Sequence, residues 1–308
     1  MKLWPDAVQM FLADPACNLT TEQSRKSYTK ALQGLHFHYP NHELEDYTEQ
    51  DLLAFCGRPD LAPNSRKGYR TRVHAFFSWA KWRGLIKEDP SSNLRRAIRP
   101  GTEPVSTFHW LSEEEVNEVL DSIDTSTLTG LRTMVVLRLG FTSGLRRNEI
   151  ASLKWGDVSL PRQQITLLGK GRKKATVFIT DRTAAVLEKW HAAFAEGLGR
   201  DPKDEPVVCR FQRLADFKGT FYTEPMWGDG LSPDAVARIV DRASKEVGID
   251  FKAHDMRRSF AGILEDRGVP IQDISVALRH SNIGTTQRYL EKRQDAAYRA
   301  VRARGFDL

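Results

Sequence analysis

Residues 254–290 include side chains that can bind or attack a phosphodiester. His254 and Arg257 are three residues apart, so on a helix they share one face and can serve one ligand together. His280 follows, and Tyr289 comes nine residues after it. An arginine can hold phosphate oxygens, an imidazole can transfer a proton, and a phenol can act as a nucleophile. Each of these residue types can therefore bind or attack a phosphodiester.

Two upstream segments offer further cations. Arg146 follows a Ser-Gly turn at the start of a predicted helix, and Glu149, one helical turn on, can hold its guanidinium. Lys170 lies in the sequence GKGRKK, between Gln164–Leu168 and Ala175–Ile179, whose alternation predicts the two strands of a hairpin. Each signal alone is weak, because arginines at helix starts and lysines at hairpin tips commonly lie in solvent.

The elements that must position these residues are predicted to be mostly helices. Apolar side chains recur at helical spacing at Phe260, Ile263 and Leu264, so the helix that begins near His254 packs against a core and ends at Gly268. Capping residues and amphipathic patterns predict further helices. They span residues 4–14, 21–38, 63–83, 271–278 and 285–290.

The composition suggests a partner that carries negative charge. The chain has 308 residues, 46 Lys+Arg against 40 Asp+Glu, and a net charge of +6, so local basic clusters must attract an anionic partner. Cys17, Cys56 and Cys209 show no CxxC spacing, which argues against a disulfide framework or a zinc site. No signal peptide or membrane span is predicted, and we expect a cytoplasmic, nucleoid-associated protein.

The length suggests two domains. Residues 84–104 contain three prolines and two glycines and few apolar residues, which is typical of a linker. We therefore expect an N-terminal helical domain with its linker at residues 1–103 and a C-terminal domain with a tail helix at residues 104–308.

Basic residues of the first domain are candidates for contact with a phosphate backbone. One face of the helix 63–83 is basic and lies opposite an apolar stripe, and more arginines fall in the linker; a solvated basic face is the alternative interpretation. Trp79 and Trp82 are expected in the core. The predicted contacts in this domain are Arg66, Lys67, Arg70, Arg95 and Arg96. The hairpin tip adds Arg172 and Lys173.

Taken singly, these side chains more often serve surfaces or local hydrogen bonds. Taken in order, they resemble the catalytic set of the tyrosine recombinase family, which includes phage integrases and Xer-type recombinases. The matching segments are TSGLRRNEIASLKW, LLGKGRKKATVFI, AHDMRRSFAGIL and LRHSNIGTTQRYL. The resemblance covers residues 108–292 strongly and the N-terminal helices weakly. One departure is Arg279, where the family commonly has glycine before the histidine.

The resemblance implies a mainly α fold with a small antiparallel β-sheet or hairpin. It consists of an N-terminal helical core-binding domain and a mixed α/β catalytic domain. It also implies a site-specific recombinase that cuts and rejoins DNA through a 3′-phosphotyrosyl intermediate. In that reaction Tyr289 attacks, Arg146 and Arg257 hold the phosphate, and Glu149 supports Arg146. Lys170 protonates the leaving 5′ oxygen. The remaining roles fall to His254, as base or donor, and to His280, as donor to a non-bridging oxygen.

The bond energy is kept in the tyrosyl ester, so no cofactor and no metal are expected. The implied partners are a double-stranded DNA recombination site and an accessory directionality factor. The chain is also expected to form a homotetramer on two duplexes through its C-terminal tail. Two alternatives stay open: a DNA-relaxing enzyme of the type IB topoisomerase kind, and a catalytically silent DNA-binding accessory protein.

Overall fold

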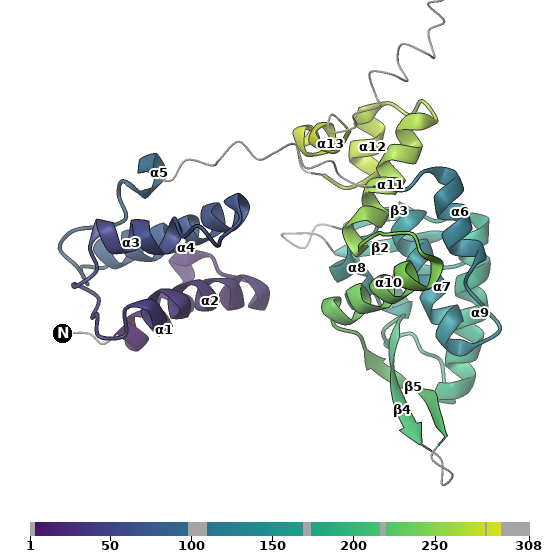
Figure 1. Ribbon diagram of the computed structural model, residues 1–308. Helices are drawn as coiled ribbons and strands as arrows, with labels where there is room; N and C mark the ends of the chain where they lie inside the picture. Colours follow the sequence, from purple (N-terminus) through teal and green to yellow (C-terminus); the bar gives the residue numbers. More distant parts are fainter. Residues whose placement is uncertain (1–3, 98–109, 169–173, 216–219, 281, 291–308) are drawn as a thin grey trace, which may run out of the picture. The chain divides into compact units, whose positions relative to one another are not determined.

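The computed structural model describes residues 4–97, 110–168, 174–215, 220–280 and 282–290 (Figure 1). The chain divides into two compact units, Met1–Val105 and Ser106–Leu308. Helices dominate both units, and the strands form two small antiparallel sheets in the second. The predicted fold class is therefore confirmed. No helix in the described ranges is both long and apolar enough to cross a membrane.

The first unit is a helical bundle around an aromatic core. Trp4 lies against Tyr47 and Phe76, with ring centroids 4.7 and 5.1 Å apart, and Phe11 meets Phe76 edge-on. Side-chain caps fix the helix starts, as where Thr48 and Asp51 form a capping box. The elements are α1 (Trp4–Ala13), η1 (Pro15–Cys17), α2 (Glu22–His38), α3 (Glu49–Cys56), α4 (Pro63–Trp82) and α5 (Leu94–Ala97).

Two expectations for this unit are corrected. Ile86 and Leu94 are buried in its core, so residues 84–97 pack as part of the unit and are not an extended linker. The apolar side chains there are few, but each is large enough to anchor the backbone. Trp79 is buried as expected, whereas Trp82 is 64% exposed, with the Arg83 guanidinium 4.4 Å above its ring. Near the end of α4, the ring of Trp79 therefore faces the bundle and that of Trp82 does not.

The second unit is built around α7 (Leu128–Phe141), which is apolar on almost every side and largely buried. Helices from both halves of the unit pack against α7. They are α6 (Glu113–Asp121), α8 (Arg147–Ser152), α9 (Asp181–Leu198), α10 (Pro233–Val247) and α11 (Ala253–Asp266). Gly140 lets α11 approach closely, because a Cβ there would lie 2.5 Å from the Met256 Cε.

The strands lie beside this helical core. The first sheet has the order β1-β2-β3 and is antiparallel, with Ile165 opposite Val177. Its strands are β1 (Val158–Ser159), β2 (Gln164–Leu168) and β3 (Lys174–Phe178), which follow the 3-10 turn η2 (Trp155–Asp157). The second sheet pairs β4 (Cys209–Ala215) with β5 (Phe221–Gly230). This hairpin was not predicted from the sequence.

Two short helices follow α11. They are α12 (Ile271–Ala277) and α13 (Ile283–Leu290). Leu290 is buried with Ala261, Ile274 and Leu278 in a small core of its own, so α13 is held against α11 and α12. This packing fixes the backbone of the segment in which Tyr289 was expected to be the nucleophile.

Candidate active site

Four of the expected catalytic residues come together in the second unit. Arg146 is the N-cap of α8, His254 and Arg257 lie in the first turns of α11, and His280 follows α12. They act on one another electrostatically, because Arg146 and Arg257 both lower the pKa of His254 and of His280. Residues more than a hundred positions apart in the sequence therefore share one site.

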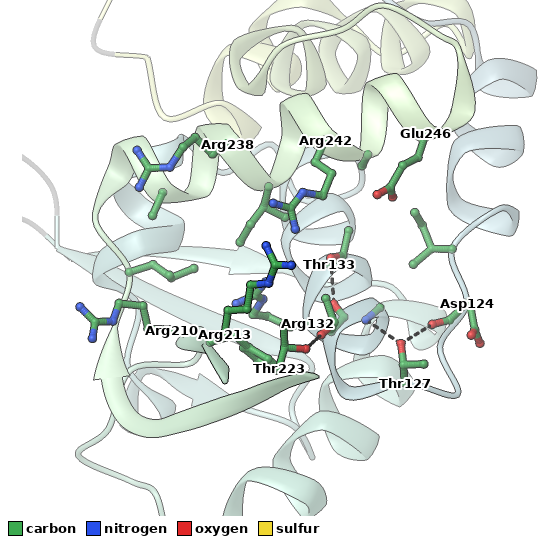
Figure 2. A pocket seen from close by; sticks show the side chains of 18 of the residues that line it. Asp124, Thr127, Arg132, Thr133, Arg210, Arg213, Thr223, Arg238, Arg242 and Glu246 are labelled. Atoms are coloured by element: carbon green, nitrogen blue, oxygen red, sulfur yellow. Dashed lines mark hydrogen bonds between the residues drawn. The ribbon is translucent and has the colours of Figure 1, made fainter. Parts of the chain in front are cut away.

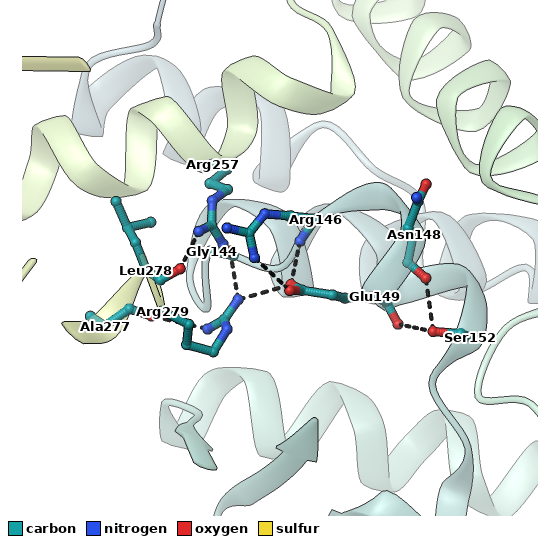
Figure 3. A network of polar contacts seen from close by, with 9 residues as sticks. All are labelled: Gly144, Arg146, Asn148, Glu149, Ser152, Arg257, Ala277, Leu278 and Arg279. Carbon is teal, nitrogen blue, oxygen red and sulfur yellow. Dashed lines mark hydrogen bonds and ion pairs between the residues drawn. The ribbon is translucent and has the colours of Figure 1, made fainter. Parts of the chain in front are cut away.

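A carboxylate holds Arg146 in place. Glu149 Oε2 accepts the backbone N–H of Arg146 at 2.8 Å, and its Oε1 accepts from Arg146 Nη1 at 2.7 Å (Figure 3). Burial opposes the ionisation of Glu149, but the charges of Arg279 and Arg146 and the backbone N–H hold the pKa of Glu149 below its ordinary value. The Arg146 side chain stays 40% exposed, so it can still reach a ligand.

Arg257 is fully buried and ties three elements together. Its Nη1 donates to the Gly144 carbonyl, in the turn before α8, and its Nη2 donates to the Leu278 carbonyl at the end of α12 (Figure 3). Gly144 needs to be glycine, because its φ is +60° and a Cβ would lie 2.6 Å from the Phe260 Cδ1. The expected clamp on a phosphate stays a prediction; the structure adds that Arg257 organises the turn beside Arg146.

Both histidines are neutral at pH 7. Burial first, and then the charges of nearby arginines, lower the pKa of each to about 4. His254 keeps an exposed edge that a ligand can reach, whereas His280 is half-buried. The His280 Nδ1 lies 2.8 Å from the Thr286 hydroxyl, which connects the site to α13. Neutral imidazoles can accept a proton as well as donate one.

Lys170, Arg172 and Lys173 lie outside the described residues, and so do the side chains of Arg95 and Tyr289. The backbone at Tyr289 lies within α13.

The predicted basic face of the first unit is only partly open. Lys67 and Arg96 are exposed, whereas Arg66 donates to the carbonyls of Arg58 and Pro59 at 3.0 and 3.2 Å. Arg70 is 8% exposed, so its placement on the open basic face was wrong. The turn of α4 that carries Arg70 faces the bundle, and the long apolar stem of arginine tolerates burial better than its head.

A second basic feature was missed in the sequence. A cavity of about 780 Å³ lies between α7, α10 and the β4–β5 hairpin (Figure 2). Its lining includes Arg132, Arg210, Arg213, Arg238 and Arg242. Burial, with a further effect of Arg242, lowers the pKa of Arg132 to about 10. In the sequence these arginines are scattered over 111 positions, and the packing of α10 and the hairpin around α7 brings them to one cavity.

The carboxylates at this cavity do not balance its arginines. Asp124 and Glu246 line the cavity, and Asp229 pairs with Arg210 at 3.2 Å. No described residue forms an ion pair with Arg238 or Arg242. The cavity therefore carries a positive excess.

Comparison with known proteins agrees with this geometry. The model of the phage integrase family matches residues 109–295 of the chain, which include every expected catalytic position. The chain belongs to this family. Family membership and the similarity to Xer proteins make it a tyrosine-type site-specific DNA recombinase.

Two relatives show how far the similarity extends. Tyrosine recombinase XerC of Myxococcus xanthus is 30% identical over 234 residues, which cover 75% of this recombinase and 73% of XerC. Tyrosine recombinase XerD of Listeria monocytogenes is 28% identical over 240 residues, covering 77% and 75%.

Two experimental structures share the fold. XerH bound to a palindromic difH substrate, in a post-cleavage complex, has a TM-score of 0.69 at 19% identity and covers 96% of this chain and 84% of that one. A lambda integrase dimer bound to a COC' core site has a TM-score of 0.66 at 17% identity and covers 94% and 77%.

Proposed function

We propose that the recombinase breaks and rejoins double-stranded DNA at a recombination site through a 3′-phosphotyrosyl intermediate on Tyr289. The observation that carries this proposal is the convergence of Arg146, His254, Arg257 and His280 in one part of the second unit. Two arginines and two neutral imidazoles match what a phosphodiester exchange requires, namely neutralised charge on the phosphate oxygens and movable protons.

The first step transfers the 3′ phosphate of one DNA strand from the 5′ oxygen to Tyr289. The phenol oxygen of Tyr289 attacks the phosphorus, and the bond from phosphorus to the 5′ oxygen breaks. The neutral His254 takes the phenolic proton, and Lys170 gives a proton to the leaving 5′ oxygen. The reverse attack by a 5′ hydroxyl of another strand releases the tyrosine and reseals the DNA. No net hydrolysis occurs, so the ester energy is kept.

The arginines and the second histidine stabilise the transition state. Arg146 is partly exposed and held by Glu149, so it can place its remaining N–H groups on a non-bridging oxygen. Arg257 contributes its buried charge from behind the Gly144 turn. If the His280 Nδ1 accepts the hydroxyl proton of Thr286, then Nε2 carries the hydrogen and can donate to the phosphate.

DNA contact also extends beyond the cleavage site in this proposal. The arginine-lined cavity beside α10 supports it, because a positive excess attracts a phosphate backbone. In the first unit, Lys67 and Arg96 are exposed and suited to the same role. Residues 1–103 then act as the core-binding domain and residues 104–308 as the catalytic domain. We further propose a homotetramer on two duplexes joined through the C-terminal tail, and an accessory directionality factor.

Covalent capture of DNA tests this proposal. The full chain is mixed with a library of duplexes, each nicked near a random central sequence, so that a short cleaved fragment diffuses away and the adduct accumulates. We expect a denaturation-resistant complex enriched in one sequence, and no complex with the Tyr289→Phe variant, which should still bind DNA. Adducts without sequence preference would favour a type IB topoisomerase-like enzyme. Binding without any adduct would favour a silent accessory protein.

A further inference from the structure

Arg279 has a backbone conformation that a long side chain adopts at a cost. Its φ is +55°, in the left-handed region, directly before His280. A residue with a Cβ adopts this conformation less favourably than glycine, and such strain persists where the surroundings compensate for it. The contacts of the side chain must therefore explain why an arginine occupies this turn.

Those contacts lead into the candidate active site. The Arg279 side chain is 11% exposed, and its Nη2 donates to Glu149 Oε2 at 2.9 Å and to the Gly144 carbonyl at 3.2 Å (Figure 3). Its Nη1 donates to the Ala277 carbonyl at 3.0 Å. Glu149 is the carboxylate that also holds Arg146, and Gly144 O is the carbonyl that also accepts from Arg257.

The charges at this junction show what Arg279 changes. Arg146, Arg257 and Arg279 carry three positive charges, and Glu149 carries one negative charge, which leaves an excess of two. Without Arg279 the excess would be one, and Glu149 would be paired with Arg146 alone. Because one carboxylate is shared between two guanidinium groups, Arg146 is less fully neutralised and more of its charge remains for a ligand.

We infer that Arg279 is a positioning residue for DNA cleavage. It holds Glu149 and the Gly144 carbonyl in place, so that Arg146 and Arg257 keep their positions and the site keeps its excess positive charge for the scissile phosphate. This inference rests on the proposed phosphotyrosyl reaction. Arg279 acts through its neighbours, which distinguishes it from the residues proposed to touch the phosphate.

Substitution at position 279 separates this role from a structural one. Arg279→Gly should still fold, because glycine adopts a φ of +55° without strain, and relief of that strain offsets part of the lost hydrogen bonds, so the melting temperature should fall only moderately. We expect it to form the covalent adduct on the captured site about 10- to 100-fold more slowly, the effect of losing one hydrogen bond to a charged group. Arg279→Lys, which keeps the charge, should recover part of that loss. Arg267→Ala removes an exposed ion pair with Glu113 and serves as the matched control.

A substrate with a methylphosphonate at the scissile position supplies the second measurement. This group lacks the negative charge that the arginines neutralise, so the gap between Arg279→Gly and the unmodified chain should shrink to less than about 3-fold. Equal rates on normal DNA would overturn the inference, and so would an equal slowing on both substrates. Neither result would affect the proposed function, which fails only if the unmodified chain forms no adduct or Tyr289→Phe still forms one.

Discussion

Replacing Glu149 with glutamine should both destabilise the folded protein and slow formation of the covalent adduct. The carboxylate accepts three hydrogen bonds, from the backbone N–H and Nη1 of Arg146 at 2.8 and 2.7 Å and from Arg279 Nη2 at 2.9 Å. Glutamine has nearly the same shape, but it is neutral and offers one acceptor oxygen instead of two. Both arginines then lose their charged partner, and at least one of them also loses a hydrogen bond.

The size of the effect follows from the exposure of each pair. The Arg279 side chain is 11% exposed, so losing its charged partner should cost about 1.5–3 kcal/mol. The Arg146 side chain is 40% exposed, so solvent screens its pair and we assign it about 0.5 kcal/mol. Glu149→Gln should therefore lower the unfolding free energy by about 2–3.5 kcal/mol at pH 7.

The pH dependence gives this prediction a second test. The pKa of Glu149 is lowered from 4.5, so its stabilising effect is fully present above pH 4.5 and is lost as the pH falls through the folded-state pKa. Urea unfolding of both chains should show a difference that shrinks under acid conditions. Formation of the covalent adduct should also slow, because Arg146 loses its anchor, while DNA affinity should not fall. Equal stability at pH 7, or a difference that does not shrink as the pH falls below 4.5, would refute this reasoning.

Three further predictions concern separate parts of the molecule. In the free protein, the ring protons of His254 and His280 should titrate near pH 4 in NMR spectra, and bound DNA should raise both midpoints; midpoints near 6.5 would contradict the described electrostatics. Because folding lowers the pKa of both histidines, their protonation favours the unfolded chain. The unfolding free energy should therefore be highest above pH 6.5 and decline as the pH falls toward 4. The logarithm of DNA affinity falls as the logarithm of salt concentration rises, and Arg242→Glu should make this fall less steep by about 0.9 for each lost phosphate contact. The control Arg162→Glu changes an exposed residue and should leave the steepness nearly unchanged. Gly140→Ala should destabilise the second unit by about 1–3 kcal/mol in thermal unfolding, because the new methyl meets Met256, and an unchanged melting temperature would show that Met256 can move aside.

Helices whose start signals lie in a few neighbouring residues could be predicted from the sequence. The helix predicted at residues 63–83 is observed as α4 (Pro63–Trp82), which begins with a proline at its first position. The β4–β5 hairpin could not be predicted in this way, because most side chains of β4 are exposed and charged or polar ones such as Arg210 and Gln212 interrupt the apolar pattern. Its strands are held by pairing with each other, and that pairing leaves little trace in a burial pattern.

In the candidate site, too, local features could be predicted from the sequence and contacts between distant residues could not. Residue types and their order could be predicted, because a phosphodiester exchange needs arginines, imidazoles and a phenol whatever the scaffold. The burial of Arg257 and the ion pair of Arg279 with Glu149 could not be predicted. Gly144 lies 113 positions from Arg257 and accepts through a backbone carbonyl, which has no sequence signature, and Glu149 lies 130 positions from Arg279. Arg279 gives one signal, an arginine directly before the histidine, but its sequence position does not reveal the partner.

The Gly144 turn explains why these distant residues meet. Its carbonyl accepts from Arg257 on α11 and from Arg279 after α12, while Arg146 begins α8 two residues later. Two like charges can share one carbonyl only where a carboxylate lies close by, and Glu149 fills that place. A turn with a φ of +60° aims the carbonyl toward α11 and leaves no room for a side chain beside Phe260. The backbone at Gly144, with no chemistry of its own, thus sets the distances between the charged groups.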